Sequence, residues 1–288
     1  MTKFILGTAN FGNRYGVANN GDLLSREKIK SIVNWAQVNG INRFDTATAY
    51  GEAESILNTS LDYSLSPAVD TKLNKKSCQS SESIIHTANK IREQLGLKQL
   101  SVLYLHDEDL LQSSLSTEVT KGMLEVLNLG IAEKIGVSVY SKKSVFRCKA
   151  ALPELTVFQV PENICDRRIA SSDQIQQLSE NGNSFVVRSI FLQGLLLMQP
   201  EQIPTGLMSA TRVIQELNDY ARLHSLSVME LCVAYAKRLT WASGIVIGVA
   251  SLDQLMEIQK CSSILPCDWS TAISTLPLDI VDPRRWSL

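Results

Sequence analysis

The chain has 288 residues, of which 44% are hydrophobic and 20% are charged, and its formal net charge is −1 at pH 7. These values fit a globular protein with a sizeable core, arranged as one large domain or two small ones. The absence of a basic block argues against a nucleic-acid surface. The absence of an uninterrupted apolar run of about 18 residues argues against a membrane span.

The six cysteines are scattered along the chain, form no CxxC pair and have no histidine nearby. This spacing favours buried free thiols in a reducing cytoplasm over disulfides or a metal site. The N-terminal residues also lack the apolar segment of a signal peptide. We therefore expect a cytoplasmic protein without a metal site.

Short apolar runs rich in β-forming residues alternate with longer amphipathic runs. In the first amphipathic run Ser25 can cap a helix, apolar residues such as Ile29 and Ile32 recur at helical spacing, and Gly40 can end the helix. Strands are predicted in this way at residues 4–6, 42–44, 69–72, 101–105, 134–137, 156–160, 185–188 and 245–247. Helices are predicted at residues 25–39, 52–61, 81–95, 118–129, 142–150, 172–179, 210–223, 228–239 and 252–261.

This alternation predicts a parallel sheet with helical crossovers, and eight such units can close into a (β/α)8 barrel. The rival fold, an open doubly wound sheet, would normally carry a GxGxxG turn after the first strand, and the chain has none. Residues 7–12 have the glycine spacing of a P-loop, but Asn13 and Arg14 stand where its Lys and Ser/Thr would be. We expect residues 1–288 to form a single (β/α)8 TIM-barrel domain of eight parallel strands, with extra helices near the eighth strand and the C-terminus.

Polar residues stand at nearly every predicted strand end, which is where the active site of such a barrel lies. In chain order the residues at the eight strand ends are Thr8, Asp45, Lys72, His106, Ser138, Gln159, Arg188 and Gly248. Packing alone does not explain this pattern, because core positions normally hold apolar side chains.

Four of the polar residues near strand ends make chemical sense together. Asp45 and Lys72 follow adjacent strands and can form the pair that a buried carboxylate needs. A cation near the hydroxyl of Tyr50 would lower its pKa from about 10, which makes a usable proton donor near neutral pH. His106, one strand further on, could hold a carbonyl oxygen between itself and the tyrosine. The alternative is a structural ion pair beside a packed tyrosine.

Several segments, taken together and in order, resemble the aldo-keto reductase superfamily, in particular its bacterial-type members. The resembling segments are FDTATAYGEAE (44–54), DTK (70–72), LYLH (103–106), IGVS (135–138), FQVPEN (158–163), IGVASLDQLME (247–257) and DPRRW (282–286). The resemblance extends over essentially the whole chain. It implies a carbonyl reductase on a (β/α)8 barrel that depends on NADPH or NADH and needs no metal.

The resemblance also assigns roles to individual residues. It implies that Tyr50 is the general acid, that Lys72, held by Asp45, lowers its pKa, and that His106 orients the substrate carbonyl. The cofactor-binding residues it implies are Gly7, Thr8, Ser138, Gln159, Arg188, Gly248, Val249, Ala250, Ser251, Gln254 and Glu257. Within this set Ser138 and Gln159 would hold the nicotinamide carboxamide, residues 248–251 the adenosine phosphates, and Gln254 and Glu257 the adenosine end.

Some positions depart from the family pattern. Val139 replaces an asparagine that binds the carboxamide in many members, and Arg188 replaces a tyrosine that stacks on the nicotinamide. Because a guanidinium can also stack on a planar ring, we expect Arg188 to lie against the cofactor, with an outward salt bridge as the alternative. Gly248 and Gln254 stand where NADP-selective members carry basic residues. NADPH is the expected cofactor from family habit, and NADH is its rival.

The loop after the first strand contains Asn10, Arg14 and Tyr15. These side chains either shape the substrate pocket or only stabilise the loop.

The expected function is reduction of a small aldehyde or ketone, with a sugar-derived carbonyl as one class of substrate. The alternatives are a sensor or regulatory subunit that binds NADP(H) without turnover, and a reversible sugar dehydrogenase or epimerase on the same fold. The expected partner is a small-molecule carbonyl substrate, with no nucleic acid or membrane. The sequence does not define the oligomeric state.

Overall fold

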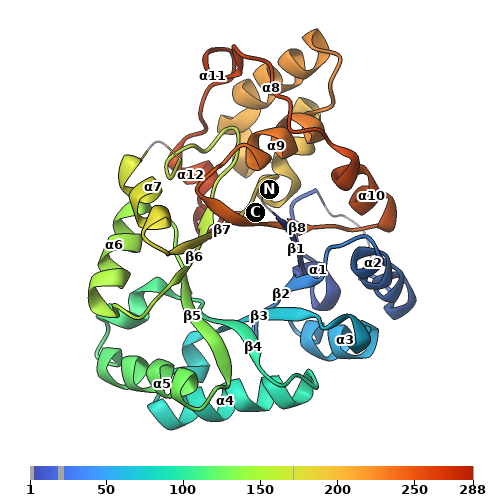
Figure 1. Cartoon of the computed structure of the whole chain (residues 1–288). Coiled ribbons are helices and arrows are strands. Elements are labelled where there is room, and N and C mark those ends of the chain that lie inside the picture. Colours follow the sequence, from blue (N-terminus) through green and yellow to red (C-terminus); the bar gives the residue numbers. More distant parts are fainter. Residues whose placement is uncertain (1–2, 19–22, 171, 288) are drawn as a thin grey trace.

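The computed structural model describes residues 3–18, 23–170 and 172–287. In this part of the chain eight strands pair in parallel in the order β1 to β8, and β8 pairs back to β1 to close a barrel. Figure 1 shows the strands as an inner ring with the helices around it. The predicted (β/α)8 barrel is confirmed.

The observed elements begin and end close to the predicted ones. The strands are β1 (Lys3–Gly7), β2 (Arg43–Asp45), β3 (Ala68–Leu73), β4 (Leu100–Leu105), β5 (Ala132–Ser138), β6 (Val157–Pro161), β7 (Ser184–Arg188) and β8 (Ala242–Gly248). The helices are α1 (Ala9–Gly12), α2 (Arg26–Val38), α3 (Ala53–Ser60), α4 (Ser81–Gln94), α5 (Ser116–Asn128), α6 (Lys142–Ala151), α7 (Asp173–Glu180), α8 (Thr211–Leu223), α9 (Val228–Lys237), α10 (Leu252–Lys260), α11 (Trp269–Ala272) and α12 (Leu278–Val281).

Local signals set the ends of the helices. The Ser25 side chain accepts a hydrogen bond from the Lys28 amide and caps α2, which satisfies one of the free donors of the first turn. After α2, α4 and α5 the chain turns at Gly40, Gly96 and Gly130, each with positive φ, where a residue without Cβ is least strained.

Two apolar clusters lie on the two sides of the sheet. The larger one packs alternate strand residues such as Leu6 and Phe44 against the helices. The smaller one, with Ile5, Val102 and Tyr104, consists of the intervening strand residues. Since successive side chains of a strand point to opposite faces, this smaller cluster fills the inside of the barrel.

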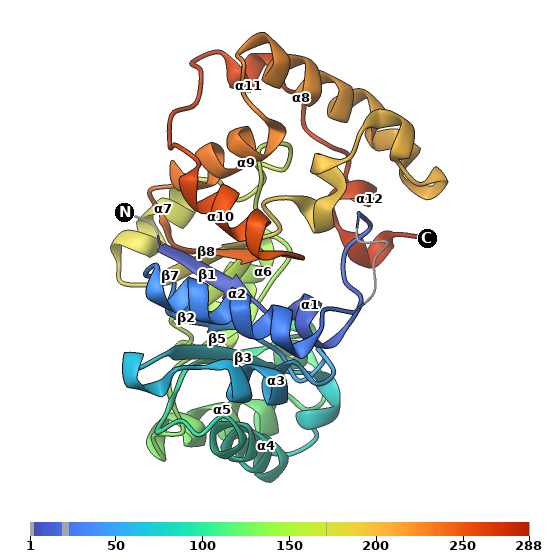
Figure 2. The ribbon, with the colours of Figure 1, turned by 90° about the vertical axis from the view of Figure 1, so that its right-hand side faces the viewer.

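The extra helices lie where they were predicted, near β8 and the C-terminus. Figure 2 shows α8 beyond α9, with α11 beside it and α12 near the end of the chain. Short 3-10 segments between β7 and α8, and the short helix α1, were not predicted, because segments of this length carry too little periodicity to be recognised. No helix in the described ranges is long and apolar enough to cross a membrane.

Gly136 on β5 tests how tightly the barrel interior is filled. A Cβ atom there would lie 2.5 Å from the Val157 carbonyl oxygen and 2.7 Å from the Tyr104 ring. We therefore expect Gly136→Ala to lower the free energy of unfolding by about 1–3 kcal/mol, the usual cost of overpacking, measured by urea denaturation.

Gly40 offers a control, since it has a φ of 85° but nothing within 4 Å of the position that a Cβ atom would take. Asparagine tolerates this backbone region, so Gly40→Asn should cost less than about 1 kcal/mol. An equal loss in the two variants would show that the interior of the barrel is not the cause.

Candidate active site

A buried ion pair lies at the carboxyl ends of β2 and β3. The Lys72 ammonium lies 2.6 Å from Asp45 Oδ2 and also donates to the Thr46 carbonyl oxygen at 3.0 Å. Both side chains are almost fully buried. The predicted pairing of Asp45 with Lys72 is therefore present, and it satisfies a charge that would be costly to bury alone.

Gln159 on β6 completes this pair from across the barrel. Its amide nitrogen donates to Asp45 Oδ1 at 2.7 Å, so each carboxylate oxygen has a partner. The sequence assigned Gln159 to a nicotinamide carboxamide. In the structure the amide N–H serves Asp45, which leaves the amide oxygen of Gln159 for a ligand.

Tyr50 lies in a turn that several backbone contacts fix after β2. The Thr48 amide and hydroxyl both donate to the Lys72 carbonyl oxygen, and the Tyr50 amide donates to the Ala47 carbonyl oxygen at 2.9 Å. A Cβ atom on Gly12 would clash with the Tyr50 carbonyl oxygen. The glycine thus allows α1 to approach this turn closely.

The tyrosine, the lysine and a histidine gather at one point. The Lys72 ammonium lies 5.5 Å from the centroid of the Tyr50 ring. The ring of His106, at the end of β4, lies 6.2 Å from the same ring and perpendicular to it. The structure therefore brings together Asp45, Tyr50, Lys72 and His106 as the sequence predicted.

The pKa of Tyr50 moves opposite to the expected direction. Burial raises this pKa above its ordinary value of 10.0, and the Asp45 charge raises it further, whereas Arg188 lowers it. The lysine does not produce the expected lowering because its charge is matched by Asp45 in the ion pair. The Tyr50 phenol is consequently protonated at neutral pH and holds a proton that it can donate.

His106 is held in its neutral form. Burial, together with the nearby charges of Lys72 and Arg188, lowers its pKa to about 4. At neutral pH one ring nitrogen of His106 therefore carries a proton and the other accepts. Such a ring can donate a hydrogen bond to a carbonyl oxygen without a net charge.

A cavity of about 220 Å³ begins at Asp45 and Tyr50 and extends toward α10. The predicted site residues that line it are Gly7, Thr8, Asp45, Tyr50, Gln159, Arg188, Gly248, Ala250 and Gln254. The other predicted residues, Lys72, His106, Ser138, Val249, Ser251 and Glu257, do not line it. Among these, Lys72, Ser138 and Val249 are buried, and Glu257 is exposed.

The far end of the cavity is formed by the start of α10. The Ser251 side chain caps this helix by accepting from the Gln254 amide, and Gln254 Oε1 accepts from the Ala250 amide at 2.8 Å. Gly248 has open space where a Cβ atom would be. A helix N-terminus beside an open glycine suits the phosphates of a dinucleotide, so the cleft fits a cofactor that extends from Tyr50 to α10.

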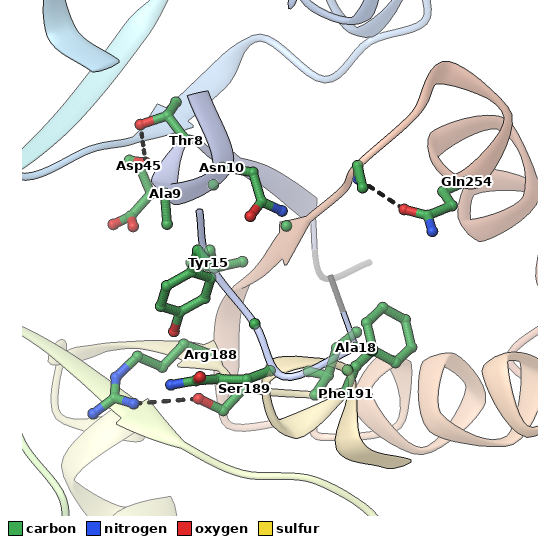
Figure 3. A pocket seen from close by; sticks show the side chains of 18 of the residues that line it. Thr8, Ala9, Asn10, Tyr15, Ala18, Asp45, Arg188, Ser189, Phe191 and Gln254 are labelled. Carbon is green, nitrogen blue, oxygen red and sulfur yellow. Dashed lines mark hydrogen bonds between the residues drawn. The ribbon is translucent and has the colours of Figure 1, made fainter. Parts of the chain in front are cut away.

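Residues of two loops border the cavity: Tyr15 and Ala18 from the loop after α1, and Arg188, Ser189 and Phe191 from the end of β7 and the loop after it (Figure 3). The loops contact each other, since the Val17 amide donates to the Gln193 carbonyl oxygen at 3.0 Å. The sequence left open whether Asn10 and Tyr15 shape a pocket, and both residues line the cavity.

The conformation of the loop after β7 was not predicted from the sequence. Its residues Ser189, Leu192 and Gln193 have positive φ without being glycine, a conformation that residue type does not announce. Gly194 was the available signal, because a glycine soon after a strand indicates a tight turn. Tyr140 was also missed as a neighbour of the site, and its ring lies 4.3 Å from the Arg188 guanidinium carbon.

We expect Asp45→Asn to lower the free energy of unfolding by about 3–5 kcal/mol, because it leaves the buried Lys72 ammonium without a counter-charge. Chemical denaturation measures the effect. The matched control is the double variant Asp45→Asn, Lys72→Met, which removes the uncompensated ammonium and should recover much of the loss. A single variant as stable as the parent chain would contradict a buried pair.

We expect the His106 ring to titrate near its pKa of about 4, followed by the NMR shifts of its ring protons, with His106→Gln to identify the signals. The unfolded ring titrates near 6.5, so between pH 4 and 6.5 the unfolded chain binds more protons at this position. The free energy of unfolding should therefore rise with pH across this window, less steeply in His106→Gln. Titration at 6.5 in the folded protein would contradict this burial.

Comparison with known proteins agrees with the barrel fold. Two solved structures share the fold. One is a thermostable aldo-keto reductase, Tm1743, in complex with the inhibitor epalrestat; it is 16% identical, has a TM-score of 0.71, and the match covers 94% of this chain and 93% of that one. The other is PA4992, assigned as an aldo-keto reductase of Pseudomonas aeruginosa; it is 16% identical, has a TM-score of 0.64, and the match covers 90% of this chain and 87% of that one. A comparison with curated protein sequences gives no significant match. The model of the Aldo/keto reductase family matches residues 3–268, and the chain therefore belongs to this family.

Proposed function

We propose that the chain is an NAD(P)H-dependent oxidoreductase that reduces an aldehyde or ketone to an alcohol, with Tyr50 as the proton donor. The observation that supports this best is the position of Tyr50. Its protonated phenol lies next to a neutral imidazole, at one end of a cleft whose other end is a helix N-terminus. This arrangement suits a proton donor at the reacting end of an elongated cofactor.

Tyr50 and His106 act on the carbonyl oxygen of the substrate. Both carry a proton at neutral pH, so both can donate a hydrogen bond to that oxygen and polarise the carbonyl bond. As negative charge develops on the oxygen, the Tyr50 proton moves to it and a phenolate remains. The ammonium of Lys72, 5.5 Å from the Tyr50 ring centroid, lies near enough to stabilise that phenolate.

Asp45 and Gln159 hold Lys72 in position. Asp45 holds the lysine through the ion pair, and the Gln159 amide holds the other carboxylate oxygen. The net charge of the pair stays near zero, which keeps the resting phenol protonated. Their role is thus to fix the lysine while the tyrosine and histidine contact the substrate.

When bound, a nicotinamide cofactor supplies the hydride that goes to the carbonyl carbon. The Ser138 hydroxyl has no protein partner among the described residues, and the Gln159 amide oxygen is also available, so these two groups would hold the carboxamide. The N-terminus of α10 would hold the phosphates. Residues 248–257 contain no Lys or Arg, and a 2′-phosphate prefers charged donors. The usual cofactor of the family favours NADPH, whereas the lack of positive charge in this segment favours NADH.

The Tyr50→Phe variant tests the assigned proton donor. It removes one hydroxyl and should reduce turnover at least 100-fold, the low end for general acid catalysis. Initial rates with a panel of aldehydes and ketones measure this effect. The dissociation constants of NADPH and NADH, measured by fluorescence, should stay within about twofold of the parent values, because the hydroxyl serves chemistry rather than binding.

Stopped-flow oxidation of the bound cofactor separates this proposal from a sensor. The parent protein should oxidise NADPH or NADH in the presence of at least one carbonyl compound of the panel. Tight cofactor binding without oxidation by any carbonyl would favour a sensor or regulatory subunit. Near-normal turnover of the Tyr50→Phe variant would refute Tyr50 as the acid.

A further inference from the structure

We propose that Arg188 recognises a carboxylate on the substrate, so that the natural substrate is an aldehyde or ketone that carries a carboxylic acid group. This inference rests on the proposed reductase function and names the substrate class of that same site. Arg188 ends β7 and lines the cavity together with Tyr50 and Tyr15. Figure 3 shows its side chain near Tyr15.

Arg188 is a half-buried cation without an acidic partner. Among the described residues no carboxylate lies within 4.0 Å of its guanidinium, which donates to the Ser189 hydroxyl and to the Val139 carbonyl oxygen, both at 3.3 Å. The other cations of this region are matched. Lys72 pairs with Asp45 at 2.6 Å, and Arg284 pairs with Asp282 at 2.8 Å.

Two carboxylates of neighbouring elements are occupied elsewhere. Glu108 accepts from the Tyr140 amide at 2.8 Å and from the Ser144 hydroxyl at 2.9 Å. Asp282 accepts two hydrogen bonds from Arg284. The positive charge of Arg188 is therefore uncompensated at the mouth of the barrel, and an anionic ligand group would compensate it.

The guanidinium is also held in place for such a group. Its carbon lies 4.3 Å from the centroid of the Tyr140 ring, a cation–π distance that fixes the plane of the fork. A guanidinium has five N–H donors, and the two hydrogen bonds to Ser189 and Val139 leave the others for a ligand. These donors suit the two oxygens of a carboxylate, which arginine binds in a bidentate manner.

The site favours a carboxylate over a phosphate. One uncompensated guanidinium matches the single charge of a carboxylate, whereas a phosphate dianion would call for more charged donors. The field of Arg188 reaches the reacting groups, since it lowers the pKa of Tyr50 and of His106. Arg188 and Tyr50 also line the same cavity, so an acid group bound at Arg188 would place the carbonyl of a short substrate within reach of Tyr50.

The test compares 4-carboxybenzaldehyde with its methyl ester, which has the same aldehyde and no charge. We expect the parent enzyme to show a kcat/KM at least 10-fold higher for the acid. In Arg188→Met the value for the acid should fall about 10- to 100-fold, the effect of a hydrogen bond to a charged group. The value for the ester should change less than about threefold, since it makes no ionic contact.

Two variants provide controls. Arg284→Met removes a cation that lies 3.6 Å from the same Tyr140 ring but is already matched by Asp282, which retains Arg285 at 3.7 Å; it should leave the preference for the acid unchanged. Arg188→Lys keeps the charge without the planar fork and should give an intermediate preference.

Three outcomes would overturn the assignment: no preference for the acid in the parent enzyme, an equal loss for acid and ester in Arg188→Met, or a higher kcat/KM for 4-formylphenyl phosphate than for the carboxylate. An equal loss for acid and ester together with a larger dissociation constant for NADH or NADPH would instead place Arg188 against the cofactor.

Binding separates this inference from the reductase function. Calorimetry with 4-(hydroxymethyl)benzoate, the alcohol that reduction would yield, needs no turnover. Binding that is lost in Arg188→Met would support the carboxylate site even if no aldehyde were reduced. Equal binding by the parent protein and Arg188→Met would refute it even if both were active.

Discussion

The ion pair of Lys72 with Asp45 is the constraint on which the site depends. Both groups are buried, and further hydrogen bonds help to make the pair tolerable: the Lys72 ammonium also donates to the Thr46 carbonyl oxygen, and the Gln159 amide donates to the second oxygen of Asp45. Asp45, Lys72 and Gln159 stand on β2, β3 and β6. The closed barrel must therefore hold three strands in one register to keep a single lysine charged beneath Tyr50.

The ion pair of Lys72 and Asp45 has no net charge, and this explains how charge is distributed at the mouth of the barrel. Because the Lys72 charge is matched, it does not turn Tyr50 into a resting phenolate, and burial keeps the pKa of Tyr50 high and that of His106 low. The reacting groups are thus both neutral and both protonated. The one half-buried cation next to them that lacks an acidic partner within the described residues is Arg188, so recognition and proton transfer fall to different side chains.

The sequence predicted the barrel and the four gathered residues because these depend on spacing. Strands recur at intervals of one βα unit, and the carboxyl ends of parallel strands meet at one rim. It did not predict the contact of Gln159 with Asp45 or that of Arg188 with Tyr140. Those contacts depend on side-chain rotamers across the barrel, which no linear pattern records. The loop after β7 was missed for a similar reason, since Ser189 and Leu192 adopt positive φ that only the surrounding contacts impose.

A second acid–base pair, on β2 and β3, shows what Arg188 lacks. Asp70 is fully buried, its pKa is raised to about 6 by burial despite Arg43, and its carboxylate is held by Arg43 at 2.8 Å. Asp45 and Asp70 thus each have a basic partner, and the exposed Arg284 has Asp282. An isolated cation such as Arg188 is retained at a cost, because a half-buried charge is poorly solvated. That cost is offset when a ligand supplies the missing anion, which makes the position of Arg188 an argument about the substrate rather than about the fold.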